Sequence, residues 1–455
     1  MTKRGRRIAV VGGGLAGITA ALRCADAGHD VVLLESRGLL GGLTHSFTRG
    51  DLHVDNGQHV FLRCCTAYLG LLRRLGVADR VHLQPRLEIP VRSPRSRRPV
   101  WLRRNRLPAP LHLADSVLRY SPLGLADRMR FAGAALALKS VDPAAPGSDR
   151  RTFGEWLRAH GQSREAITKL WDLVGIATLN APAERASLGL AATVFQVGLL
   201  TDAAAADIGW ATVPLRRLHG DPALAALTAA GVDVRLGSKV TALGREDDRW
   251  RVGADEPVEA DSVVLAVPPG AAAKLLPAGA VRLPPNFADG LGSSPIVNVH
   301  VVFDRPVARE PFFAAIDSPV QWVFDRTASA GLTGGGQYLA ISLSAADEEI
   351  GLPVRALRQR MLPALLDLLP GARDAGIRDF FVTRERHATF RPAPGCAGLR
   401  PPARTRVPGL VLAGAWTATG WPATMEGAVR SGEAAAQALP GTPARVPGRP
   451  EGIPA

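Results

Sequence analysis

The 455-residue sequence predicts an α/β protein in which a parallel nucleotide-binding sheet is interrupted by an inserted α+β domain. Three observations predict this fold class. A βαβ unit with a glycine-rich turn occupies the first 36 residues, buried-strand patterns return at residues 263–267 and 410–413, and helical and strand-like segments lie between them. Strands that are distant in sequence would therefore complete one sheet.

The βαβ unit can be followed residue by residue. Residues 7–11 form an apolar run that ends in glycines, as a buried parallel strand does. Helical spacing follows over residues 15–27, and Gly28 suits the C-terminal end of that helix. Residues 31–34 are a second buried strand that ends at Glu35, so the crossover should be right-handed.

The remaining elements alternate in character. An Arg- and Pro-rich stretch at residues 85–106 predicts a hairpin, and residues 110–230 are mostly helical in pattern. We therefore expect a nucleotide-binding domain made of residues 1–85, 228–285 and 395–439, a substrate domain made of residues 86–227 and 286–394, and a disordered tail over residues 440–455.

The composition argues against a disulfide scaffold, a zinc-finger protein and a transmembrane protein. The four cysteines lack any metal-ligand spacing, and no apolar run is long enough to span a membrane, which favours a cytoplasmic enzyme with reduced thiols. The formal charge is +14, but only five of the 55 basic residues are lysines. Three explanations of this arginine excess stay open: a coding bias, contact with an anionic membrane, and binding to nucleic acid. Of the two partners, we do not expect nucleic acid.

The strongest motif is Gly12-Gly13-Gly14-Leu15-Ala16-Gly17, which has the form G-x-G-x-x-G. It follows a strand, opens a helix, and precedes an acidic residue, Glu35, at the end of the next strand, which is the context of a dinucleotide site. Gly12 permits the turn, Gly14 lets the backbone approach a pyrophosphate, and Gly17 lets helix and strand pack. Glu35 can accept hydrogen bonds from the adenosine ribose.

Longer blocks narrow the assignment. They are Asp55-Asn56-Gly57-Gln58-His59-Val60, Leu107-Pro-Ala-Pro-Leu-His-Leu113, Leu170 to Asn180, and the Trp- and Thr-rich block Leu412 to Gly432. Together they resemble the hydroxysqualene dehydroxylases, also called squalene-associated FAD-dependent desaturases, within the amine oxidase and carotenoid desaturase group. The resemblance covers residues 7–438 and implies an amine-oxidase-type Rossmann-like fold with FAD. The sequence has no Cys or His attachment motif, so we expect the FAD to be bound non-covalently.

The resemblance also implies which residues meet the cofactor. The matched positions are Gly12, Gly13, Gly14, Ala16, Gly17, Glu35, Ser36, Gly41, Gly42, Gly57, Gln58, His59, Val240, Gly414, Trp421, Met425 and Glu426. Two positions depart from the group's pattern, because Leu43 stands where an arginine usually follows the paired glycines, and Ala415 stands where aspartate is common.

Carried over by position, His59 lies beside the isoalloxazine. An imidazole that titrates near neutral pH can protonate a departing hydroxide, and Asp55 is the candidate that orients it. The alternative for His59 is a hydrogen bond to flavin or backbone only. For Glu426 the alternative is a carboxylate placed by a helix dipole.

The activity that the resemblance implies is reductive removal of the allylic hydroxyl of hydroxysqualene, which gives squalene. We expect a long-chain isoprenoid substrate, an unidentified electron donor, and peripheral contact of the Arg-rich hairpin, including Arg95, Arg97 and Arg98, with an anionic membrane at its inner face. Two alternatives stay open: a carotenoid-type desaturase, and a non-enzymatic FAD-containing protein that binds lipid or nucleic acid.

Overall fold

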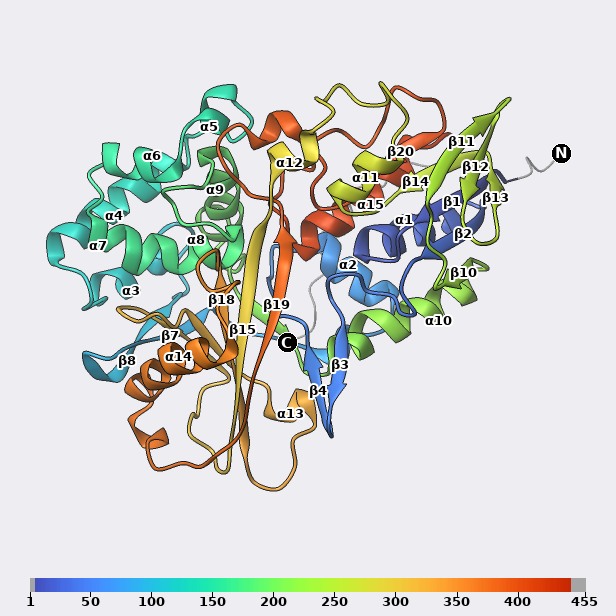
Figure 1. Ribbon diagram of the computed structural model, residues 1–455. Helices are drawn as coiled ribbons and strands as arrows, with labels where there is room; N and C mark the ends of the chain where they lie inside the picture. Colours follow the sequence, from blue (N-terminus) through green and yellow to red (C-terminus); the bar gives the residue numbers. More distant parts are fainter. Residues whose placement is uncertain (1–4, 443–455) are drawn as a thin grey trace.

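A five-stranded parallel sheet collects strands from three distant parts of the chain. The computed structural model describes residues 5–442 and places this sheet at one end of the molecule (Figure 1). The strand order is β10-β2-β1-β14-β20, and every neighbouring pair is parallel. The strands are β1 (Arg7–Val11), β2 (Asp30–Glu35), β10 (Asp233–Leu236), β14 (Ser262–Leu265) and β20 (Leu410–Leu412). The α/β class is confirmed.

Both faces of the sheet are covered, which explains why its strands are continuously apolar. Alternate residues such as Val10 and Val264 pack against one layer of helices, while Val11 and Val263 pack on the other side with Trp250 of a small antiparallel meander. The helices are α1 (Leu15–Asp26), α2 (Thr66–Arg74), α10 (Asp221–Ala229) and α15 (Met425–Ala438), and the meander strands are β11 (Ala242–Glu246), β12 (Arg249–Gly253) and β13 (Val258–Ala260).

A mixed seven-stranded sheet forms the centre of the other half. Its order is β19-β15-β18-β17-β16-β7-β8, and the predicted Arg-rich hairpin is its edge pair β7–β8. The strands are β7 (Glu88–Ser93), β8 (Ser96–Arg103), β15 (Ser294–Phe303), β16 (Phe312–Ala315), β17 (Trp322–Asp325), β18 (Gln337–Ser344) and β19 (Ile377–Thr389). Helix α14 (Val354–Leu368) buries Leu357, Met361, Leu365 and Leu368, which share one face at helical spacing.

A layer of helices forms the outer end of this half, opposite the parallel sheet (Figure 1). Its helices are α3 (Ala114–Leu118), α4 (Leu125–Leu138), α5 (Pro146–Arg150), α6 (Phe153–Ala159), α7 (Arg164–Ala166), α8 (Asp172–Leu179) and α9 (Leu188–Phe195), with π-helical turns η3 (Ile167–Trp171) and η4 (Gln196–Leu200). Leu170 and Leu173 pack on Phe312 and Ile89 of the mixed sheet, which joins the two layers through one apolar core.

One strand departs from the helical pattern expected for residues 110–230. β9 (Ile208–Ala211) lies between β5 (Val60–Leu62) and β6 (Val81–Leu83) in a small antiparallel sheet. Four residues are too few to show the two-residue alternation of a strand within a helical region. The sequence therefore could not predict β9, which forms by pairing with β5 and β6. Of the tail predicted as disordered, residues 443–455 lie outside the described range.

The remaining elements are short. They are β3 (Ser46–Arg49), β4 (Leu52–Asp55), α11 (Pro269–Leu275), α12 (Phe287–Leu291), α13 (Thr327–Ala330), the π-helical turn η5 (Arg216–Gly220), and the 3₁₀ turns η1 (Ala78–Arg80), η2 (Leu111–Leu113), η6 (Pro370–Ala372) and η7 (Cys396–Leu399).

Candidate nucleotide and substrate site

The glycine turn between β1 and α1 has the geometry that the motif predicts. Gly12 has a φ of +108°, and a Cβ there would lie 2.4 Å from the Ala266 carbonyl oxygen. A Cβ on Gly17 would lie 1.8 Å from the Gly12 carbonyl oxygen, so the helix packs directly on the turn. A Cβ on Gly14, in contrast, would meet only the Gly42 Cα, at 3.8 Å. Gly14 therefore leaves room in front of the helix N-terminus, where a pyrophosphate fits.

A second glycine turn lies against the first. The Gly41 amide donates to the Gly13 carbonyl at 2.9 Å, and Gly41 pairs with Gly14 as an isolated parallel bridge. A Cβ on Gly42 would approach the Gly14 Cα to 2.9 Å, which explains why glycine occupies position 42. Leu43 follows as a side chain that is 39% exposed, at the position where the resemblance leads one to expect arginine.

Glu35 is buried and braces the first turn. Its Oε2 accepts from the Gly13 amide at 2.6 Å, and its Oε1 accepts from the Arg37 amide at 2.8 Å and the Ser36 hydroxyl at 3.1 Å. The Glu35 carbonyl also accepts from the Ser238 amide at 2.8 Å, which brings the buried Val240 segment to this edge of the sheet. The ribose contact of Glu35 stays a prediction.

We predict that Glu35→Gln weakens nucleotide binding by about 1.5–3 kcal/mol, because it removes a charge-assisted acceptor and disturbs the brace on Gly13. Titration of the apoprotein with FAD measures the loss. Glu256→Gln, at a highly exposed carboxylate, is the matched control. Equal affinity in both variants would show that the Glu35 carboxylate does not act on the nucleotide.

The C-terminal block surrounds the end of β20. Gly414 has a φ of +135°, and its amide donates to the Ser431 hydroxyl at 2.8 Å. Trp416 is buried, donates from Nε1 to the Val267 carbonyl at 3.0 Å and stacks on Phe287. Trp421 lies under the Arg430 guanidinium, 4.8 Å from it, shortly before Met425 opens α15.

Arg400 organises this block and was not identified from the sequence. It is buried, and its guanidinium donates to the carbonyl oxygens of Trp421 and Thr417, both at 2.7 Å. Longer bonds reach the carbonyls of Ala415 and Trp416, at 3.3 Å each. Burial lowers the Arg400 pKa to about 10 because it removes water from the charged guanidinium. No ion pair with another described residue offsets this effect. A lone arginine that precedes two prolines carries no sequence signal of this role.

Glu426 has a structural role at the N-terminus of a helix other than its own. Its carboxylate is buried at the N-terminus of α2, where it accepts from the Ala67 amide at 3.2 Å and the Tyr68 amide at 2.8 Å. It also pairs with Arg430 at 2.6 Å. The helix-dipole alternative is thus realised, but with a helix other than its own. A cofactor contact of Glu426 stays a prediction.

His59 and Asp55 do not form the acid pair that the sequence predicts. Burial lowers the His59 pKa to about 4, so the imidazole is neutral at pH 7 rather than titrating there. Asp55 bonds instead to the Ser46 hydroxyl at 2.6 Å, the Leu215 amide at 3.0 Å and the Arg326 guanidinium. The expected roles of a protonated His59 and of an orienting Asp55 are therefore corrected: Asp55 ties the β3–β4 hairpin to Arg326.

Three buried polar atoms around this loop lack any partner among residues 5–442. They are Gln58 Oε1, His59 Nε2 and Asn298 Oδ1. Buried polar groups are almost always hydrogen-bonded in native proteins, so unpaired atoms on the 57–59 loop and on the neighbouring strand β15 indicate a missing ligand. Their position fits the flavin ring that the resemblance implies beside Gly57, Gln58 and His59.

An aromatic wall faces the same loop. A very small cavity is lined by Gln58, His59 and Val60 on one side. Its other lining residues are Trp210, Pro311, Phe312, Phe324, Asp325 and Arg326. Phe312 lies 5.4 Å from Trp210 and 6.0 Å from Phe324 between ring centroids. The wall comes from β9, β16 and β17, which belong to two different sheets.

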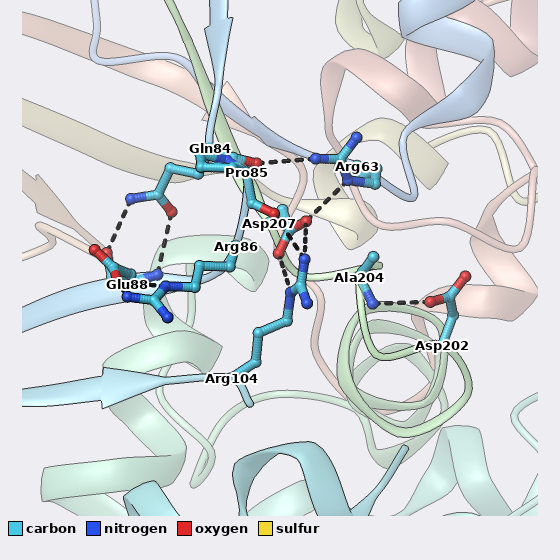
Figure 2. Close-up of polar contacts among 9 residues, drawn as sticks. All are labelled: Arg63, Gln84, Pro85, Arg86, Glu88, Arg104, Asp202, Ala204 and Asp207. Atoms are coloured by element: carbon cyan, nitrogen blue, oxygen red, sulfur yellow. Dashed lines mark hydrogen bonds and ion pairs between the residues drawn. The ribbon is translucent and has the colours of Figure 1, made fainter. Parts of the chain in front are cut away.

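A buried ion cluster holds the two halves together next to this loop. Figure 2 shows the Asp207 carboxylate between Arg63, at 2.9 Å, and Arg104, at 2.6 Å. Arg63 also donates to the Gln84 carbonyl, and Arg104 to the Pro85 carbonyl. Because Arg63 directly follows β5, the cluster fixes the strand that begins at Val60. Asp207 lies far from every motif, so sequence reasoning could not find it.

Buried histidines predict acid sensitivity. Burial lowers the pKa of His59 to about 4 and those of His219 and His300 to about 3. Because the folded pKa is depressed, the unfolded chain binds more protons, so stability is full above about pH 6.5 and falls as pH decreases. Burial raises the carboxyl pKa of Asp172 to about 6, so this group makes the folded state more stable as pH decreases. It is one group acting against the three histidines.

Urea unfolding between about pH 7 and pH 5, a range in which ordinary carboxylates remain ionised, would measure this slope. We expect the free energy of unfolding to fall across it, and His300→Gln to flatten the curve. A free energy that does not change over this range would contradict the prediction.

The described residues contain no group of histidine, cysteine or acidic side chains that could hold a metal ion. Within residues 5–442, the helices are all too short or too polar to cross a bilayer.

Comparison with known proteins extends this picture. Residues 15–440 match the model of the family described as flavin containing amine oxidoreductase. The chain is 29% identical to the hydroxysqualene dehydroxylase of Sinorhizobium fredii, over 95% of this chain and 97% of that one. It is 26% identical to the probable zeta-carotene desaturase of Synechococcus elongatus, over 95% and 98%. Cyclohexylamine oxidase from Brevibacterium oxydans shares the fold, with a TM-score of 0.70 and 18% identity over 95% and 98% of the two chains.

Proposed function

Because this chain belongs to the flavin-containing amine oxidoreductase family, we propose that it uses FAD to remove the allylic hydroxyl of hydroxysqualene and release squalene. The observation that carries the proposal is the match to the Sinorhizobium fredii hydroxysqualene dehydroxylase along 95% of this chain and 97% of that one. The coarser statement, a flavin-dependent oxidoreductase, follows from the family.

The residues present fit an FAD. Gly14 and the N-terminus of α1 would hold the pyrophosphate, and Glu35 would hold the ribose. The unpaired atoms of Gln58 and Asn298 would meet polar edges of the ring. Reduced FAD supplies a hydride when bound, and an electron donor not yet identified must restore it. Acid precipitation should release the flavin, since the cofactor is proposed to be non-covalent.

The chain's own residues suit departure of a hydroxyl from an allylic carbon. Loss of the hydroxyl leaves positive charge on that carbon, and the faces of Phe312, Phe324 and Trp210 stabilise cations. The neutral His59 can hold the hydroxyl oxygen through Nε2, the atom without a protein partner, when the proton resides on that nitrogen. With a hydride added at carbon, the hydroxyl would leave as water and would take its proton from solvent, because the neutral His59 is not an acid at pH 7.

The test is anaerobic incubation of the purified protein with hydroxysqualene and FAD reduced by dithionite, followed by mass spectrometry. Formation of squalene supports the proposal. Unchanged hydroxysqualene with a folded, flavin-loaded protein would overturn it.

A carotenoid-type desaturase is the second candidate, favoured by the 26% identity to the Synechococcus elongatus enzyme. The same flavin would then run in the oxidising direction. Incubation of the oxidised protein with phytoene or zeta-carotene separates the two, because only a desaturase adds conjugated double bonds. A protein that binds FAD and lipid but changes neither class of substrate would be the non-enzymatic alternative.

A further inference from the structure

Exposed apolar side chains concentrate in one short part of the chain. Thirteen large hydrophobic residues of the described chain are exposed, and six of these lie between residues 107 and 136. We call these six the apolar patch: Leu107, Leu111, Leu118, Leu125, Met129 and Leu136. A soluble surface usually scatters such residues singly, so a cluster of this kind marks an interaction site.

The patch has a defined geometry. Leu125, Met129 and Leu136 share one face of α4, and the opposite face buries Ala134 and Leu138. Helix α3, which ends at Leu118, is tied to α4 because Arg128 donates to the Leu118 carbonyl. Figure 1 shows α3 and α4 at the outer end of the helical layer, far from the parallel sheet.

Positive charge surrounds the patch. Residues 105–140 contain five basic side chains and two acidic ones. Both acids are neutralised locally, because Asp115 pairs with Arg119 and Asp127 with Arg130. Arg106 and Lys139 are exposed, and no ion pair is formed by either within residues 5–442. Apolar side chains bordered by cations match the acyl and phosphate layers of an anionic bilayer.

The Arg-rich hairpin, where the sequence predicts membrane contact, is less suited to this task. Arg92 pairs with Glu310 at 2.9 Å, Arg104 with Asp207 at 2.6 Å, and both Arg86 and Arg103 lie beside Glu88. Arg95 is exposed but lies 3.7 Å from Asp317. Five of the hairpin's arginines therefore already lie beside a carboxylate of the protein.

We propose that the apolar patch is a monotopic docking surface for an anionic phospholipid bilayer. This inference rests on the proposed function, because an isoprenoid substrate dissolves in the bilayer and must enter the protein from it. Docking through α3 and α4 would turn the helical layer toward the membrane and leave the nucleotide end in water.

The experiment measures flotation of the flavin-loaded full chain with vesicles of phosphatidylcholine, with or without phosphatidylglycerol. The patch variant is Leu118→Gln, Leu125→Gln and Met129→Gln combined. The control variant is Leu224→Gln, Leu236→Gln and Val354→Gln combined, which removes exposed apolar side chains outside the patch. Flavin content and melting temperature show that both variants fold.

We expect the unaltered and control chains to float with the anionic vesicles. We expect the patch variant to bind them at least tenfold more weakly, since three inserted side chains are lost, each contributing on the order of one tenfold step. Arg106→Gln with Lys139→Gln should weaken binding to anionic vesicles only, and added salt should reproduce that loss.

Three outcomes would overturn the inference. They are equal vesicle binding by the patch and control variants, no vesicle binding by the unaltered chain, and a dimer in solution that only the patch substitutions dissolve. An assay with hydroxysqualene dispersed in detergent separates this inference from the proposed function. A protein that docks on vesicles but yields no squalene in detergent refutes the reaction, whereas one that yields squalene but does not dock refutes only the surface.

Discussion

Gly14→Val is expected to abolish FAD binding while the chain remains folded. Gly14 has an ordinary φ of −76°, and a Cβ there would meet only the Gly42 Cα at 3.8 Å, so the protein itself tolerates a side chain. The new atoms instead fill the space in front of the α1 N-terminus, where the pyrophosphate must approach the backbone. We expect colourless protein and an affinity for FAD reduced by at least 100-fold, measured by titration of the apoprotein.

The matched control is Gly17→Ala, three residues further along the same turn. A Cβ on Gly17 would lie 1.8 Å from the Gly12 carbonyl oxygen, so this variant should lose stability as well as cofactor. Urea unfolding separates the two effects. A Gly14→Val protein that retains its yellow colour would show that the nucleotide does not lie against this turn.

Arg400→Met is expected to cost about 3 kcal/mol of stability or more, and to weaken FAD binding. Met retains much of the apolar stem but donates no hydrogen bond, so the buried carbonyls of Thr417 and Trp421 lose their donors. Each buried carbonyl that is left without a hydrogen-bond donor costs about 1–3 kcal/mol, and this one guanidinium donates to several carbonyls. Because the carbonyls belong to the segment that carries Gly414 and Trp421, the loss should loosen the predicted cofactor contacts as well.

Two further variants sharpen this test. Arg400→Lys keeps the charge but lacks the planar fork, so it should fall between Met and the unaltered chain. Arg158→Met removes an exposed arginine that pairs with Glu184, and should cost much less stability, because the ion pair is exposed to solvent. Urea unfolding and FAD titration measure both quantities. Equal values for Arg400→Met and Arg158→Met would mean that the 415–421 segment holds its shape without Arg400.

The parts of this protein that the sequence alone determined depend on residues that are close together in the chain. The glycine turn, the first βαβ unit and the buried face of α14 each follow from residues close together in the chain, where period and steric demand are visible. Position 12 has a positive φ and position 17 lies against the backbone of the turn, so only glycine fits at either position. The glycines of the motif therefore predict this geometry. The family resemblance added the cofactor and the reaction, which no periodicity contains.

The tertiary structure decided what depends on burial and on partners distant in sequence. His59 appeared as a titrating acid because an isolated imidazole titrates near pH 6.5, but desolvation lowers its pKa to about 4. Asp55 meets Arg326, Asp207 meets Arg63 and Arg104, and Arg400 meets the carbonyls of residues 415–421. Most of these contacts join residues from separate segments, and desolvation sums over every neighbour in space, so neither could be read from the order of residues along the chain.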